Sequence, residues 1–132
     1  MIVTKQVHGA IQAAMTGDAT LTALVPSSQF GTWLEDETIF PHILFSISDD
    51  NRNLKGEVDL SMILTVDVWT KEKGESAVYD IRDALVNLLD SSPLTIASGD
   101  FVTPFYDGTS VSVLDDGITR SATISFLMIS GR

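Results

Sequence analysis

The clearest pattern in the chain is an alternation of apolar and polar residues between Val58 and Trp69. Apolar side chains occupy every even position from 58 to 68, and the odd positions are mostly polar: Asp59, Ser61, Thr65 and Asp67. A period of two residues places the two sets on opposite faces of a β-strand, so the pattern predicts a strand with one buried face. Ile63 and Trp69 are apolar exceptions on the polar face. They indicate that something, such as another subunit, covers part of that face.

Two other segments carry apolar residues at helical spacing. The first runs from Ile2 to Met15, and Gly17 and Asp18 then separate it from a short second helix that ends at Pro26. Asp18 is suited to the N-cap of that second helix, because a short acidic side chain accepts a hydrogen bond from a free backbone N–H. A further apolar stripe lies between Ala77 and Leu89. Its spacing predicts an amphipathic helix that packs on the sheet.

The remaining strand signals are shorter. The segment from His42 to Ser48 is mostly apolar and predicts a strand, and a weaker extended piece near Phe30 and Trp33 precedes it. Further along, the segments Phe101–Val113 and Ser121–Ile129 predict the two strands of a hairpin. The turn between them is predicted at Asp115-Asp116-Gly117. The order of helices and strands lacks the regular alternation of a parallel sheet. We therefore expect an α+β fold, with a mostly antiparallel β-sheet and helices packed on one face. The length of 132 residues fits a single domain over residues 1–132.

Charge and composition exclude several functions. The chain has 18 acidic and 8 basic residues, a net charge of −10, and the basic residues form no cluster, so direct binding of nucleic acid is not expected. It has no cysteine, which excludes disulfides, thiolate metal sites and a cysteine nucleophile. The N-terminus has no signal-peptide pattern, and no stretch approaches the length of a membrane span. We expect a soluble protein that is not exported and has no membrane partner.

Candidate chemistry is nearly absent. His8 and His42 lie on different predicted elements and have no metal-ligand spacing. The run that starts at Asp49 resembles a calcium loop but has Leu54 where glycine is needed and Leu60 where a bidentate glutamate is needed. Asp107-Gly108 and Asp115-Asp116-Gly117 are typical of turns, with a cation at a subunit interface as the lesser alternative. The sequence predicts no enzyme and no catalytic, cofactor-binding or metal residues.

Interface residues are the remaining candidates. Trp69 is interpreted as a packing or interface residue rather than a base-stacking platform, because no basic residues surround it. We therefore name Ile63, Trp69 and Trp33 as candidate interface residues. The acidic loop from Asp49 to Glu57 is either a solvated connection or long enough to reach a neighbouring subunit.

The order of these features resembles the tail terminator, or tail completion, proteins of long-tailed bacteriophages and tail-like particles. Five segments carry the resemblance: Gly17–Val25, Phe40–Leu44, Leu64–Thr70, the helix Ala77–Leu89 and Asp116–Arg120. They span nearly the whole chain. No single segment is diagnostic, and the specificity comes from the ordered set together with the strand end at Val68-Trp69. The stretch Ser27–Glu37 departs from the family pattern, because it lacks the expected arginine, aliphatic and aromatic turn.

The resemblance implies a structural virion protein, located in the tail or neck and assembled in the host cytoplasm. Such proteins form a ring, usually a hexamer, on the head-proximal end of the tail tube, stop tube polymerisation and join the tail to the head connector. Their partners are other copies, the tube protein and the head completion protein, and DNA passes through the channel without specific binding. Two alternatives stay open: another neck protein of the same particle, or a small monomeric ligand-binding domain with a weak cation site at Asp115-Asp116.

Overall fold

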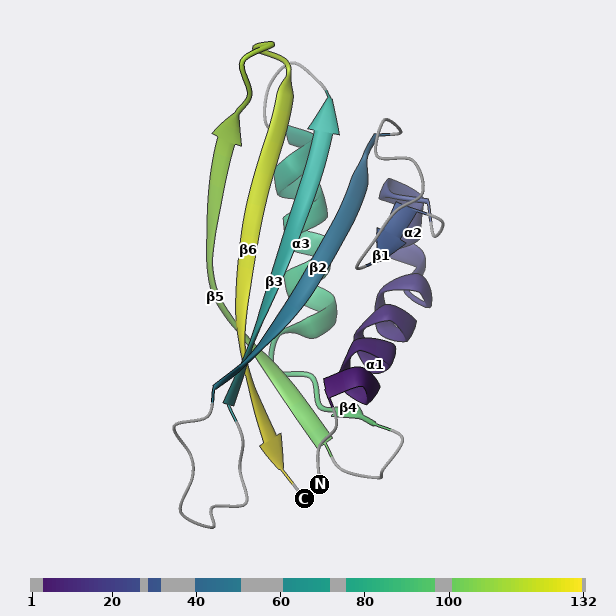
Figure 1. The fold of residues 1–132 in the computed structure, drawn as a ribbon. Coiled ribbons are helices and arrows are strands. Elements are labelled where there is room, and N and C mark those ends of the chain that lie inside the picture. Colours follow the sequence, from purple (N-terminus) through teal and green to yellow (C-terminus); the bar gives the residue numbers. More distant parts are fainter. Residues whose placement is uncertain are drawn as a thin grey trace.

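The computed structural model describes residues 4–26, 29–31, 40–50, 61–71, 76–96 and 101–131. Their elements follow the chain from the N-terminus to the C-terminus (Figure 1). The helices are α1 (Thr4–Thr16), α2 (Ala19–Leu24) and α3 (Ser76–Leu89). The strands are β1 (Phe30–Gly31), β2 (His42–Asp50), β3 (Ser61–Lys71), β4 (Leu94–Thr95), β5 (Phe101–Val113) and β6 (Thr119–Gly131).

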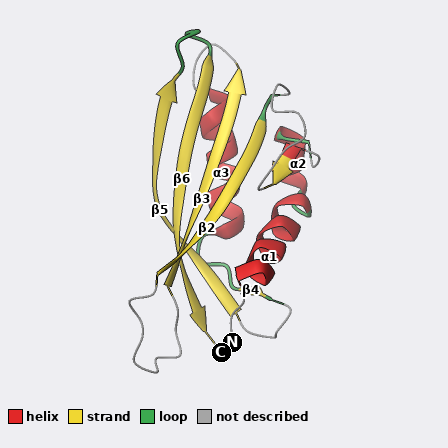
Figure 2. Cartoon of the chain, viewed as in Figure 1, coloured by secondary structure: helices red, strands yellow, loops and turns green. Residues whose placement is uncertain are grey.

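The strands form one six-stranded sheet in the order β1-β2-β3-β6-β5-β4. The short β1 runs parallel to β2, and every other neighbouring pair is antiparallel. The helices lie on one side of the sheet, as Figure 1 and the colouring of Figure 2 show. The α+β class, the mostly antiparallel sheet and the placement of the helices on one face are therefore confirmed. The short strand β4 was not predicted.

The core lies between the helices and one face of the sheet, which we call the inner face. The alternation on β3 is confirmed over its described part, because the even positions from Met62 to Val68 are buried. Val66 lies between Phe45 of β2 and Ile124 of β6, so neighbouring strands contribute apolar side chains at the same level. The apolar stripes of α1 and α3 cover this face with Val7, Ile11, Met15, Val78, Ile81, Leu85 and Leu89.

Asp18 is the N-cap of α2, as predicted. The Asp18 carboxylate accepts a hydrogen bond from the Leu21 backbone N–H at 2.9 Å. This bond satisfies one of the N–H groups that the first helical turn leaves without a partner, and Leu21 itself is fully buried. The cap therefore fixes the direction in which α2 enters the core.

One turn prediction is wrong. Asp107-Gly108 does not form a turn but lies within β5, where the pairing with β6 shifts between Tyr106 and Gly108. This irregularity is a β-bulge, in which one extra residue interrupts the ladder. Glycine occurs both in turns and in bulges, so the dipeptide alone did not distinguish the two. The turn at Asp115–Gly117 is confirmed, and Gly117 has the positive φ of 72° that glycine adopts easily.

Candidate assembly surface

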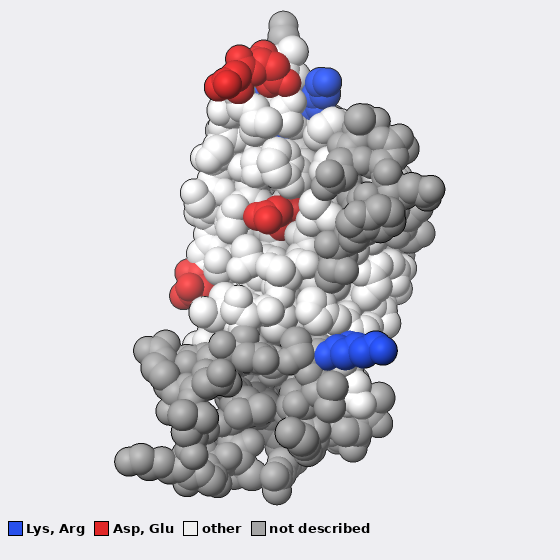
Figure 3. Space-filling model, in the orientation of Figure 1, with Lys and Arg blue, Asp and Glu red and all other residues white. Residues whose placement is uncertain are grey.

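The face of the sheet opposite the helices, which we call the outer face, is open to solvent among the described residues. Figure 3 shows few charged side chains across it, and carboxylates gather at the end formed by the β5–β6 turn. The odd positions of β3 lie on this face, and the register places serine and threonine residues beside them on β2 and β6. Along one row, Ser46, Thr65, Ser125 and Gly108 are level with one another.

A patch of large apolar side chains lies at one end of the outer face. Ile63 of β3 is level with Leu127 of β6, and Leu127 is level with Phe105 of β5. The exposed fractions are 43% for Ile63, 42% for Phe101, 40% for Leu127, 39% for Phe105 and 38% for Ile129. We call these five residues the apolar patch. Contiguous apolar side chains that are exposed on a folded chain mark a contact surface.

Polar side chains occupy the middle of the outer face. The Asp67 carboxylate accepts a hydrogen bond from the Thr123 hydroxyl at 2.9 Å, across the β3–β6 pair. This bond holds the carboxylate against the sheet. The middle of the face is therefore a hydroxyl-rich surface that carries little charge.

An aromatic corner lies at the other end of the outer face. The rings of His42 and Trp69 stack with centroids 6.0 Å apart, and the Phe40 ring lies 5.0 Å from His42. The Lys71 ammonium sits 5.7 Å from the centre of the Phe40 ring. A hollow of about 280 Å³ opens here, lined by Phe40, His42, Trp69, Leu114 and Thr119. The Trp69 Nε1 atom is buried without a hydrogen-bond partner among the described residues.

The β5–β6 turn beyond this corner is held by Asp116. Its carboxylate accepts hydrogen bonds from the Thr119 hydroxyl at 2.5 Å and from the backbone N–H groups of Thr119 and Ile118 at 2.8 and 2.9 Å. These bonds stabilise the charged form and lower the pKa of Asp116 from 3.8 to about 2. Both carboxylate oxygens already serve the turn, which supports the structural interpretation over a cation site.

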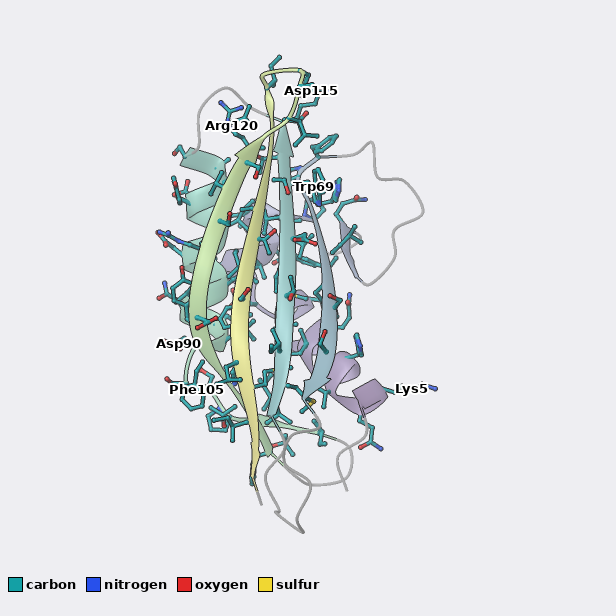
Figure 4. The ribbon with its side chains drawn as sticks, turned by 60° about the vertical axis from the view of Figure 1, so that its left-hand side comes forward. Lys5, Trp69, Asp90, Phe105, Asp115 and Arg120 are labelled. Atoms are coloured by element: carbon teal, nitrogen blue, oxygen red, sulfur yellow. The ribbon has the colours of Figure 1, made fainter. Side chains whose placement is uncertain are left out.

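The structure places two of the three candidate interface residues on one face. Ile63 and Trp69 both lie on the outer face, with Ile63 43% exposed and Trp69 half-buried. They are six residues apart on one strand, about 20 Å, and Figure 4 shows Trp69 near one end of the sheet and Phe105 near the other. They therefore belong to two separate surfaces. Trp33 and most of the acidic loop at 49–57 lie outside the described residues.

Sequence reasoning missed four residues of the apolar patch. The segment Phe126-Leu127-Met128-Ile129 is apolar at every position. An unbroken apolar run predicts a strand that is covered on both faces, and this signal was present in the sequence. Phe101 and Phe105 were harder to place, because the bulge in β5 interrupts the alternation of that strand.

A second hollow and the placement of the metal-ligating side chains bear on candidate chemistry in the described part of the chain. A second hollow, of about 350 Å³, lies between α2, α3 and the ends of β2 and β3, and it contains Lys71 and Asp80. No three His, Asp or Glu side chains among the described residues come close enough to hold a metal ion. Within the same residues, no helix has the length and apolarity to cross a membrane.

The fold and this surface define a class of protein: a small α+β domain whose sheet has one face covered by helices and one face open (Figure 1). A solved structure of the virion of a native gene transfer agent particle contains a chain that covers 98% of this one and 98% of its own length, with a TM-score of 0.81 and 14% identity. A second solved chain, without a functional name, covers 100% and 98%, with a TM-score of 0.73 and 10% identity. These similarities show the fold.

The family is shown by a match over most of the chain. Residues 9–130 match the model of the Tail completion protein gp17 family, and the chain belongs to this family. It is therefore a structural protein of the virion tail. Comparison with curated proteins gave no match.

Proposed function

We propose that this chain is a tail terminator: a single domain that assembles into a ring, of six copies by its resemblance, on the head-proximal end of the tail tube. The ring stops polymerisation of the tube and offers a surface to the head completion protein. It performs no catalysis, and DNA passes through its channel without specific binding. The observation that carries the proposal is the apolar patch on the open sheet face of a chain that belongs to a tail completion family.

The patch has the chemistry of a protein contact. Five large side chains that are each about 40% exposed lie next to one another on three strands. Association of copies that each carry a charge of −10 must bury apolar or uncharged surface to overcome their repulsion. The apolar patch and the hydroxyl-rich middle of the outer face offer such surface. We assign a second, smaller contact to the aromatic corner around Trp69, where a hollow lies beside a buried indole N–H.

The first experiment measures assembly directly. The purified protein is followed by size-exclusion chromatography with light scattering, alone and with the tube protein of its particle, and tubes polymerised with and without it are measured by electron microscopy. We expect a discrete ring-sized species, protein bound at one end of each tube, and tubes that stop growing once it is added. A protein that stays monomeric, never binds the tube and leaves tube length unchanged would refute the proposal.

The second experiment locates the contact. Phe105→Thr combined with Leu127→Thr removes two level apolar side chains from the apolar patch and replaces them with a β-branched residue, which favours strands. Tyr79→Gln is the matched control, because Tyr79 is 37% exposed but lies on α3. We expect the double variant to lose assembly with the tube and the control to keep it. Equal assembly by both variants would show that the patch is not the contact.

The nearer alternative is another neck protein of the same particle. A head completion factor would bind the head connector without limiting the growth of the tube. The tube-length measurement separates the two roles, because only a terminator changes the length distribution.

A further inference from the structure

The sheet has two edge strands that are each paired over only part of their length. On one edge, β4 pairs with β5 at Phe101 and Val102 alone. The turn after α3 adds two hydrogen bonds, from the Ser91 N–H to the Pro104 carbonyl at 2.7 Å and from the Tyr106 N–H to the Asp90 carboxylate at 2.8 Å. Beyond Tyr106, no described residue pairs with this edge of β5.

On the opposite edge of the sheet, β2 is unpaired over its C-terminal half among the described residues. β1 pairs with β2 at Ile43 and Leu44, and within the described ranges no strand pairs with that edge from Phe45 to Asp50. The free half of β5 leads toward the β5–β6 turn, whereas the free half of β2 leads toward the other end of the sheet (Figure 1). The two free segments are therefore diagonal to each other.

The usual protection of an edge strand is present only at one end of each free segment, where β5 has its bulge at Asp107 and β2 has Asp49 and Asp50. Natural edges avoid unwanted pairing with charged residues, proline or bulges. The segments Ser110–Val113 (SVSV) and Phe45–Ser48 (FSIS) contain no charge and no proline, in a chain of net charge −10, although Asp49, Asp50 and Asp107 lie just beyond them. Uncharged edges of this kind are suited to accept a strand from another subunit.

We propose that copies of this chain join edge to edge, with Ser110–Val113 of one copy pairing antiparallel with Phe45–Ser48 of the next. This inference rests on the proposed ring and names its seam. Three antiparallel pairings separate β2 from β5, so the two strands run in opposite directions within a copy. A neighbour related by rotation about the ring axis therefore presents β2 to β5 in the antiparallel sense. Such a head-to-tail contact closes into a ring when the rotation between neighbouring copies divides the circle evenly.

The pattern of side chains supports this register. Ser110 and Ser48 both lie on the outer face, and Val111 and Ile47 both point to the inner face. Val111 and Ile47 are only partly buried at the margins of the core. Pairing Val111 with Ile47 of the next copy covers both residues and makes the two cores continuous.

The offset between the free segments matches the stagger of a closed sheet. Within one copy, Ser110 pairs with Thr123, Thr123 pairs with Asp67, and Asp67 pairs with Leu44. Ser110 and Leu44 therefore lie at the same height on the two outer strands. In the seam Ser110 faces Ser48, four residues further along β2, which is about 13 Å. Each copy contributes four strands, which together span about 19 Å across the sheet. A shift of about 13 Å along the strands for every about 19 Å across them tilts the strands by about 35° from the ring axis. Closed sheets tilt their strands by about 35–45°.

The test uses the absence of native cysteine. Ser48→Cys combined with Ser110→Cys introduces two thiols that lie about 20 Å apart within one copy, beyond the reach of a short bis-maleimide. In the assembled protein, alone or with the tube protein, we expect a ladder of linked subunits that ends at the size of the ring. Each single variant links only identical positions and is expected to give no ladder.

A second variant disturbs the seam without disturbing the core. Val113 is 51% exposed, so Val113→Glu should leave the unfolding temperature nearly unchanged while placing a like charge on the β5 edge. We expect at least a tenfold loss of ring formation, and Val113→Thr should retain it. Light scattering measures assembly, and circular dichroism confirms the folded monomer.

The outcomes separate this inference from the proposed function. Rings that form normally but give no ladder, and that tolerate Val113→Glu, would refute the seam and leave the terminator role intact. Cross-linking of Ser110→Cys alone into dimers would also refute it, because it would show two β5 edges paired with each other. Failure of the wild-type protein to assemble or to bind the tube would refute the proposed function itself.

Discussion

Two adjacent residues on β3 should have opposite effects when they are substituted. Ile63 is 43% exposed on the outer face, whereas Leu64 is fully buried in the core. We predict that Ile63→Thr weakens assembly and spares the fold, and that Leu64→Ala weakens the fold itself. The comparison is sharp because the two side chains share a strand and differ only in the face they occupy.

The magnitudes follow from burial. Full burial of an isoleucine side chain is worth about 1.5–3 kcal/mol, so the exposed fraction of Ile63 leaves about 1 kcal/mol to be gained at each contact. Losing this free energy raises the dissociation constant of one contact about fivefold. Leu64→Ala creates a cavity and should cost about 3 kcal/mol of unfolding free energy. For a chain of 132 residues this lowers Tm by about 11 °C, against about 4 °C or less for Ile63→Thr.

The assay pairs thermal unfolding with light scattering. Circular dichroism gives Tm for each variant as a monomer, and the scattering gives the concentration at which tube-bound assemblies form. A large fall in Tm for Ile63→Thr, with assembly unchanged after correction for the folded fraction, would refute the assignment of Ile63 to a contact. Tyr79→Gln serves again as the exposed control.

Three further predictions concern the turn, the second helix and the net charge. The pKa of Asp116 is about 2 in the folded chain against 3.8 when unfolded, so its contribution to stability is present above about pH 4 and lost as the pH falls through 2. Unfolding measured from pH 5 to pH 2 should therefore show the gap between wild type and Asp116→Asn closing; a constant gap would contradict the hydrogen-bond assignment. Asp18→Ala should cost about 1 kcal/mol in denaturant unfolding, and Asp18→Asn, which keeps an acceptor oxygen, less. Raising salt from 0.1 to 1 M should strengthen self-association, because it screens repulsion between copies of charge −10, and weaker association would instead indicate attractive ion pairs.

Much of the fold followed from local patterns. The alternation on β3, the stripe on α3 and the turn at Asp115–Gly117 each depend on residues close together in the chain, and the structure confirms all three. β4 was missed because two residues of strand have no periodicity to detect. Asp107-Gly108 was misplaced because its role depends on pairing with β6, which is distant in sequence.

The candidate surface was predictable only in part. Alternation placed Ile63 and Trp69 on the outer face, but the strand order decided that Leu127 and Phe105 lie level with Ile63. The two free edges depend on where β1 and β4 end, and the sequence contains no signal for either limit. Surfaces assembled from several strands are properties of topology, and a single chain pattern does not reveal them.

The bulge in β5 has a consequence for curvature. An extra residue at Asp107 increases the local twist and bends the strand just where its paired half gives way to its free half. In the proposed ring, where the sheets of neighbouring subunits join edge to edge, the bend within each sheet helps to determine how many subunits close the ring. Shortening this strand by one residue would therefore change the diameter of the proposed ring and the bore of its channel.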